Sequence, residues 1–204
     1  MSAVDAAVLI PVKRFAAAKG RLAAVLGPGD RQELARWLAG RVVAAAGALP
    51  VFVACDDDEV AAWADGVGAD VLWSPGLGLN GAVDAGRTTI AGKGAGHVVI
   101  AHSDLPLASD LGALVEPGAV TLVPDRHGDG TNVMALPVDV ALAAAYGGGS
   151  FARHLARATA SGVAVSVHHD PRLELDVDTP ADLAHPLLQD VLPAWLRTSL
   201  ANPE

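Results

Sequence analysis

The sequence predicts an α/β protein built on a mostly parallel, twisted sheet with helices on both faces. Short apolar runs of strand length alternate with segments of helical periodicity from residue 6 to residue 123. The first run, 6–12, is apolar throughout, as expected for a strand that is covered on both faces. The chain has 204 residues, 51% of them apolar, which is enough for a substantial core, and we expect a single domain over residues 1–204.

Local signals place the elements of the first half. Leu34, Leu38 and Val42 recur at helical spacing, with Asp30 as the expected N-cap of a capping box and Gly47 as the expected stop. The expected elements are a strand at 6–12, a helix from 30 to 47, a strand at 51–54, a helix that begins with the acids at 56–58, a strand at 70–73, a helix from 81 to about 91, a strand at 97–101, a short helix at 110–115 and a strand at 120–123.

The second half is less regular. The run 131–136 follows a polar loop at 124–130 and alternates less cleanly than the earlier runs. A helix is expected at 151–159 and a strand at 163–167. A final helix is expected at Pro180, because Thr179 is a good N-cap and proline is favoured at the first helical position.

Composition excludes several classes of protein. The net charge of −9 disfavours nucleic acid as a partner, because a chain of that sign repels phosphate backbones. The only cysteine, Cys55, excludes a disulfide framework and a multi-cysteine metal site. No basic leader is visible and no apolar segment is long enough to span a membrane. We therefore expect a cytoplasmic protein with no membrane partner.

Three cations, Lys13, Lys19 and Arg21, follow the first expected strand. In an open α/β sheet, ligands bind at the edge formed by the carboxyl ends of the strands. Three fixed positive charges at that edge favour a polyanion, most simply a nucleoside triphosphate. A solvated basic loop is the alternative that this stretch leaves open.

Three aspartates predict a site for a divalent metal. Asp104 directly follows the expected strand at 97–101, and a carboxylate there is well placed to hold Mg²⁺, which binds one or two carboxylates plus substrate phosphates. Asp176 and Asp178 are two residues apart, so in extended geometry both point the same way. The alternative for each is a capping or turn aspartate.

Two glycine-rich turns, Gly128–Asn132 and Gly147–Ser150, carry hydroxyl groups. Backbone N–H groups at such turns, and at the start of the helix near Ser150, bind anions, and a hydroxyl can donate to a phosphate or carboxylate. Ser150 is equally well explained as an ordinary N-cap. We expect His154, one turn further on, to pack or to form hydrogen bonds rather than to catalyse.

The loop at 74–80 ends in Asn80, whose amide could contact a nucleobase, and a polar loop that caps a helix is the alternative. The sequence contains no G-x-S-x-G turn, no Walker A motif and no G-x-G-x-x-G turn after the first strand. These absences disfavour a serine hydrolase, a P-loop NTPase and a dinucleotide-dependent dehydrogenase.

Taken together, these motifs resemble the 2-phospho-L-lactate / phosphoenolpyruvate guanylyltransferase family, within the MobA-like group of nucleotidyltransferases. The resemblance rests on Lys13, Ala18-Lys-Gly-Arg-Leu22, Asp104-Leu-Pro106, Pro124-Asp-Arg126, Gly130-Thr-Asn132, Gly147 to His154 and Asp176-Val-Asp-Thr-Pro-Ala-Asp-Leu183, in this order. It covers nearly the whole chain and implies the Rossmann-like fold of that group.

The resemblance implies transfer of GMP from GTP to the phosphate of phosphoenolpyruvate or 2-phospho-L-lactate, with release of pyrophosphate, in the synthesis of coenzyme F-420. It implies Mg²⁺ as the cofactor, and a homodimer is a possible assembly. By residue, it assigns the triphosphate loop to Lys13, Lys19 and Arg21, catalysis to Lys19, Arg21 and Asp104, and the phospho-acid to Thr131, Gly147 and Ser150. It assigns the metal to Asp104 and Asp176, and to Asp178 as the matching position in more distant relatives.

Two other functions fit the same residues. One is another MobA-like transferase with a molybdopterin or sugar-phosphate acceptor. The other is a non-catalytic nucleotide-binding protein on the same scaffold, because a fold does not determine a function. Retention of all three candidate metal carboxylates speaks against the second alternative.

Overall fold

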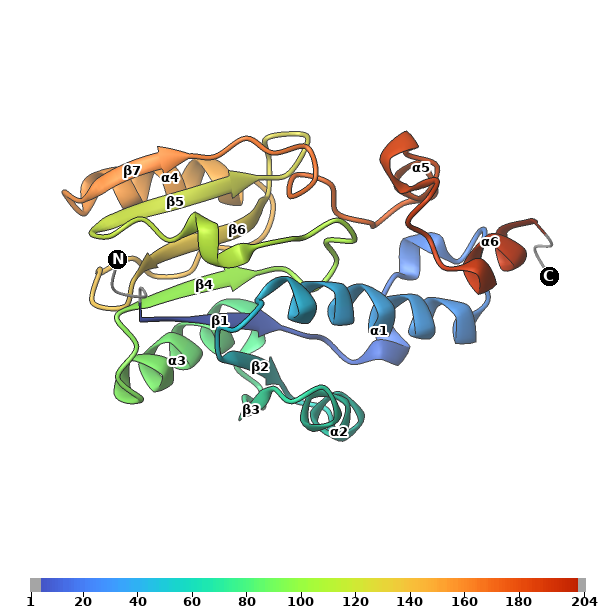
Figure 1. Ribbon diagram of the computed structural model, residues 1–204, viewed down its shortest axis with the longest axis horizontal. Coiled ribbons are helices and arrows are strands. Elements are labelled where there is room, and N and C mark those ends of the chain that lie inside the picture. Colours follow the sequence, from blue (N-terminus) through green and yellow to red (C-terminus); the bar gives the residue numbers. More distant parts are fainter. Residues whose placement is uncertain (1–4, 202–204) are drawn as a thin grey trace.

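The computed structural model describes residues 5–201 (Figure 1). One sheet contains seven strands in the order β3-β2-β1-β4-β6-β5-β7. The strands are β1 (Ala6–Pro11), β2 (Val51–Cys55), β3 (Asp70–Trp73), β4 (His97–Ala101), β5 (Ala119–Pro124), β6 (Thr131–Pro137) and β7 (Ala164–Val167). The α-helices are α1 (Pro28–Ala45), α2 (Asp58–Gly66), α3 (Gly78–Gly92), α4 (Ser150–Ala160), α5 (Pro180–Leu183) and α6 (Ala194–Ala201).

The predicted fold class is confirmed, and β6 accounts for the mixed character of the sheet. β1 pairs in parallel with β2 and β4, β2 with β3, and β5 with β7. β6 runs antiparallel to both of its neighbours, β4 and β5. Only residues 125–130 separate β5 from β6, and a parallel crossover needs about a dozen residues or more, so this connection is a hairpin.

Three helix predictions differ from the structure, and one of them is α3, which begins at Gly78 instead of the expected Gly81. α1 begins at Pro28 with Gly27 as its N-cap, so the prediction of Asp30 as the cap was wrong. Proline has the φ that the first helical position requires. Asp30 lies in the first turn, where the helix dipole stabilises its negative charge. The helix at Pro180 is not the final one, because α6 follows it and packs against α1.

Helices cover both faces of the sheet, and successive residues of β1 face opposite sides. Val8 and Ile10 belong to the core between the sheet and helices α1 and α2. Ala7 and Leu9 belong to the core between the sheet and helices α3 and α4. β1 lies inside the sheet between β2 and β4, with a core on each face, and its carboxyl end opens at one edge of the sheet beside those of its two neighbours (Figure 1).

Gly86 of α3 allows the helix to approach β1 closely, and we expect Gly86→Val to destabilise the protein by about 1–3 kcal/mol. A Cβ at this position would lie 2.9 Å from Cδ2 of the fully buried Leu9, so the core would be overpacked. Gly92→Val is the matched control, because it makes the same change in the same helix where the described chain leaves open space within 4 Å. Urea unfolding of both variants measures the difference, and equal stabilities would contradict this account of the packing.

Candidate functional site

A pocket of about 510 Å³ lies at the edge formed by the carboxyl ends of the parallel strands β1 to β4. Each of these strands is followed by residues that line it. Lys13 and Lys19 follow β1, Asp56 follows β2, Ser74 follows β3, and His102 and Asp104 follow β4. The cationic loop therefore lies at the sheet edge where ligands of α/β proteins bind.

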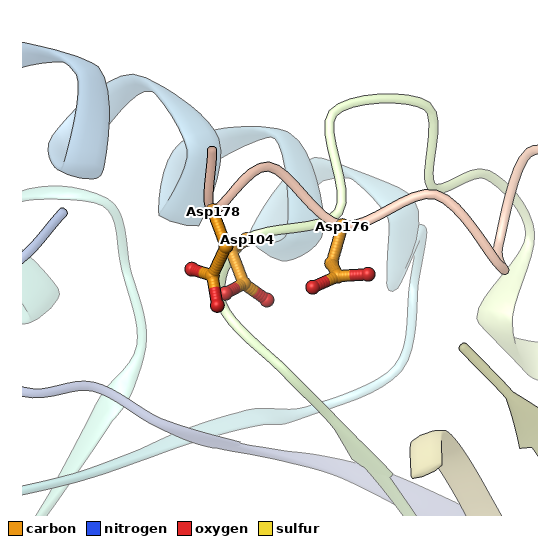
Figure 2. Close-up of side chains that lie close together, drawn as sticks. All are labelled: Asp104, Asp176 and Asp178. Atoms are coloured by element: carbon orange, nitrogen blue, oxygen red, sulfur yellow. The ribbon is translucent and has the colours of Figure 1, made fainter. Parts of the chain in front are cut away.

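Asp104, Asp176 and Asp178 converge at this edge (Figure 2). One carboxylate oxygen from each lies within 4.8 Å of the others. Asp104 follows β4, and the segment that carries the other two runs beside it, because the Val177 N–H donates to the Asp104 carbonyl oxygen at 3.1 Å. Two stretches more than seventy residues apart in the chain thus form one acidic cluster.

Lys19 connects the cationic loop to the acidic cluster. Its Nζ lies 2.8 Å from Oδ2 of Asp104 and 3.1 Å from Oδ1 of Asp178, and its side chain is only 8% exposed. The residue has a left-handed backbone with φ of 55°, which turns the chain between two short 3-10 helices, Phe15–Ala17 and Gly20–Leu22. Arg21 is 76% exposed, and its Nη1 lies 3.7 Å from Oδ2 of Asp178.

The charges of the cluster are unevenly balanced. Burial raises the pKa of Asp104, but the Lys19 ammonium outweighs this effect and leaves the pKa below its usual value. Burial, together with the neighbouring Asp104 carboxylate, raises the pKa of Asp176 to about 6. Asp176 has no ion-pair partner among residues 5–201, so the cluster keeps uncompensated negative charge.

This arrangement fits a divalent cation. All three candidate ligands offer carboxylate oxygens, the donors that Mg²⁺ prefers. Oδ1 of Asp104 is buried and has no hydrogen-bond partner within the described part of the chain. A buried carboxylate oxygen without a donor is costly, and a cation at this position would satisfy it.

Thr131 and Ser150 also come together, at the start of α4. The Thr131 N–H donates to Ser150 Oγ at 3.0 Å, and the two side chains are almost fully buried. Gly147 has φ of +117°, and its carbonyl oxygen accepts from the Ser150 N–H at 3.0 Å. Gly149 is the N-cap of α4, so the interpretation of Ser150 as the N-cap was wrong. None of the three residues lines the pocket described above.

His154 fixes Thr131 from the next turn of α4, as expected for a packing and hydrogen-bonding residue. It is fully buried, and its Nε2 accepts from the Ala145 N–H at 2.9 Å. A neutral imidazole that accepts at Nε2 carries its proton on Nδ1, which lies 2.9 Å from Thr131 Oγ1. Burial, followed by the charges of Arg157 and Arg153, lowers the pKa of His154 to about 4.

The Asn80 amide forms hydrogen bonds within the chain. Its Oδ1 accepts from the Tyr146 N–H at 2.7 Å, and its Nδ2 donates to the Tyr146 carbonyl oxygen at 3.3 Å. The amide therefore holds the connection between β6 and α4, and its expected contact with a nucleobase stays a prediction. The side chain does not line the pocket, and the pocket contacts of this region come from Gly78, Leu79 and Ala82.

His102 is a pocket residue that the sequence analysis missed. It lies two residues before Asp104, its ring stands 5.0 Å from that of Tyr146, and its Nε2 is buried without a hydrogen-bond partner in the described chain. Burial lowers the pKa of His102 and keeps the imidazole neutral. Its position directly after a predicted strand, beside a candidate metal ligand, was the signal that could have identified it.

Comparison with known proteins identifies the family that this chain matches. A model of the family described as "Guanylyl transferase CofC like" matches residues 6–190. A protein of Sphaerobacter thermophilus named phosphoenolpyruvate guanylyltransferase is 40% identical over 185 residues, which cover 86% of this chain and 89% of the relative. A protein of Rubrobacter xylanophilus with the same name is 40% identical over 186 residues, covering 86% and 90%.

Solved structures show the same fold at low sequence identity. A protein of Desulfovibrio desulfuricans G20, assigned as a nucleotide-diphospho-sugar transferase, superposes with a TM-score of 0.72 at 16% identity, covering 97% of this chain and 93% of the other. A nucleotidyl transferase of Methanothermobacter gives a TM-score of 0.63 at 16% identity, with 95% and 98% covered. Among the described helices, none has both the length and the apolar character needed to cross a membrane.

The buried His154 predicts a loss of stability in acid. The unfolded imidazole takes up a proton near its ordinary pKa of 6.5, whereas the folded one does so only near 4, so the unfolded state binds more protons between these values. The stabilisation is complete above about pH 6.5 and is lost as the pH falls to about 4, by roughly 3 kcal/mol. We expect His154→Gln to remove this dependence.

Urea unfolding of the wild type and of His154→Gln between about pH 7 and pH 4 measures the effect. The difference between the two free energies of unfolding isolates His154 from the carboxylates that titrate in the same range. A difference that does not change with pH would show that His154 is not held neutral in the folded protein.

Proposed function

We propose that this chain, which belongs to the CofC-like guanylyl transferase family, transfers the GMP unit of GTP to the phosphate of phosphoenolpyruvate and releases pyrophosphate. The match to the family over residues 6–190 and the names of its relatives support the reaction class and the acceptor. The observation that carries the proposal is the convergence of three carboxylates with Lys19 and Arg21 at the carboxyl edge of the sheet. In the family that this chain resembles, the product serves the synthesis of coenzyme F-420.

Asp104, Asp176 and Asp178 would hold Mg²⁺ in this enzyme. When bound, the ion offsets the repulsion between the anionic acceptor and the triphosphate and polarises phosphoryl oxygens. The donor set and the unpartnered Oδ1 of Asp104 fit this role.

The reaction needs little covalent chemistry from the protein. An oxygen of the acceptor phosphate attacks the α-phosphorus of GTP, a new P–O bond forms, and the bond to the pyrophosphate oxygen breaks. Positioning and electrostatic stabilisation supply most of the rate in such transfers. Lys13, Lys19 and Arg21 are the cations that we assign to the triphosphate and to the departing pyrophosphate.

Thr131, Gly147 and Ser150 are the residues that we assign to the phospho-acid. The resemblance to the family supports this assignment, and the hydrogen bond between Thr131 and Ser150 brings the first residue of β6 against the first residue of α4. The hydrogen bonds between Thr131, Ser150 and His154 hold the two hydroxyl groups in fixed positions. A rigid pair of hydroxyls loses little conformational entropy when it binds a small anion.

Product analysis tests the reaction directly. We expect the purified protein, GTP and Mg²⁺ to give a GMP adduct of phosphoenolpyruvate together with pyrophosphate, detected by mass spectrometry. The same assay with 2-phospho-L-lactate, a sugar phosphate and molybdopterin covers the alternative acceptors. GTP binding without pyrophosphate release from any of these acceptors would instead indicate a non-catalytic nucleotide-binding protein.

Removal of one charge from the acidic cluster should stop the reaction. We expect Asp104→Asn to lower turnover by about 10²–10³, because the change removes electrostatic stabilisation at the reacting phosphates. Circular dichroism and urea unfolding establish that the variant is folded. A variant that keeps more than about a tenth of the wild-type rate would contradict the assignment of Asp104.

Lys19 should have opposite effects on cation binding and on turnover. Its ammonium neutralises Asp104 and Asp178, so Lys19→Met frees these carboxylates and should tighten Mn²⁺ binding to the nucleotide-free protein by about 10-fold, or ~1.4 kcal/mol. The same change removes a charge assigned to the triphosphate, so turnover should fall.

Lys13→Met is the matched control, because Lys13 lines the same pocket but forms no ion pair with the cluster in the described structure. Paramagnetic resonance of free Mn²⁺ measures the affinities. Weaker Mn²⁺ binding in Lys19→Met would show that Lys19 does not compete with the cation for these carboxylates.

A further inference from the structure

We propose that Asp182, held by Arg126, is the positioning residue that sets the segment carrying Asp176 and Asp178 for cation binding. The inference rests on the proposed function, in which the acidic cluster holds a divalent cation. It concerns two residues that do not line the pocket and are not members of the cluster, and it assigns to them the geometry of the site.

One carboxylate oxygen of Asp182 accepts hydrogen bonds from three donors in the adjoining residues Asp178 and Thr179. Its Oδ2 accepts from the Asp178 N–H at 2.9 Å, from the Thr179 N–H at 2.6 Å and from the Thr179 hydroxyl at 2.9 Å. Asp182 is only 4% exposed, so these bonds form away from water and are correspondingly strong. The backbone of the candidate ligand Asp178 is thus fixed through its own N–H.

The other oxygen of Asp182 pairs with the guanidinium of Arg126. Arg126 lies in the hairpin between β5 and β6, and its own backbone N–H donates to the Glu174 carbonyl oxygen at 2.9 Å. Arg126 therefore holds the segment at both of its ends, at Glu174 through the main chain and at Asp182 through the side chain. Asp176 and Asp178 lie between these two anchors.

Both carboxylate oxygens of Asp182 act as acceptors. Oδ2 accepts the three hydrogen bonds described above, and the other oxygen accepts from the Arg126 guanidinium. A neutral amide in its place would offer a single acceptor oxygen and would lose the ion pair with Arg126.

A helix cap is the alternative role, because Asp182 also completes the capping box of α5. α5 contains only the four residues Pro180–Leu183, and the bond to the Asp178 N–H reaches one residue beyond the N-cap, Thr179. A cap affects the stability of the fold, whereas a positioning residue also affects the affinity of the cluster for a cation. The two roles therefore predict different measurements.

Mn²⁺ binding to the full-length, nucleotide-free protein distinguishes them. We expect Asp182→Asn to weaken Mn²⁺ affinity by about 10–100-fold, the usual effect of removing an outer partner of a metal ligand. Turnover of Asp182→Asn should recover most of the wild-type kcat when the concentration of Mg²⁺ is raised, since the ligands themselves are intact.

Asp57→Asn is the matched control. Asp57 caps α2 by accepting from the Val60 N–H at 3.2 Å and pairs with Arg14 at 2.9 Å, so it has the same kinds of partner but does not contact the cluster. Urea unfolding gives the stability lost by each variant. We expect both variants to lose stability, the buried Asp182→Asn more than Asp57→Asn, and Mn²⁺ affinity to change only for Asp182→Asn.

Arg126→Gln provides a second variant if Asp182→Asn does not fold, and we expect its Mn²⁺ affinity to fall in the same direction. Mn²⁺ affinities of Asp182→Asn or Arg126→Gln within twofold of the wild type would overturn the inference and leave the proposed function standing. A wild-type protein that does not bind Mn²⁺, or an Asp104→Asn variant that binds it equally well, would overturn the proposed cluster and the inference with it.

Discussion

Mutual repulsion among three carboxylates is the constraint on which the site depends. Asp104, Asp176 and Asp178 bring their oxygens within 4.8 Å of one another, partly shielded from water, and such an arrangement is costly without compensating charge. Lys19 supplies one positive charge to Asp104 and Asp178, and Arg21 approaches from the solvent side. The compensation is incomplete at Asp176, which explains why burial and its neighbours raise the pKa of that residue. The site is therefore suited to a further cation.

The fold brings these charges together by simple means. β1 and β4 are parallel neighbours, so the loops that carry Lys19 and Asp104 leave the same edge of the sheet side by side. The segment with Asp176 and Asp178 is not a strand of the sheet, and it reaches this edge through hydrogen bonds to the backbone of Asp104 and to Asp182. The sheet thus fixes the positions of the cationic loop and of Asp104. Contacts between loops fix the positions of Asp176 and Asp178.

The second group of functional candidates is organised around α4. His154 must accept from the Ala145 N–H, so its proton lies toward Thr131, and the Thr131 N–H in turn donates to Ser150. α3 supports the same region from the other side, because Asn80 binds both backbone groups of Tyr146 and Asp84 accepts from the Ala144 N–H at 2.9 Å. The helix whose first residues line the pocket therefore also holds the connection that carries Gly147.

The sequence by itself determined the strands, the fold class and the residue types of the site, because apolar runs, helical spacing and the residues after strand ends are local signals. It also indicated Lys19 and Asp104 at one edge, since parallel strands align their carboxyl ends. Only the tertiary structure decided that β6 lies beside β4, that Asn80 binds the backbone of Tyr146, and that Arg126 pairs with Asp182. These are contacts between segments far apart in the chain, and their partners are chosen by packing, which leaves no periodic or local mark in the sequence.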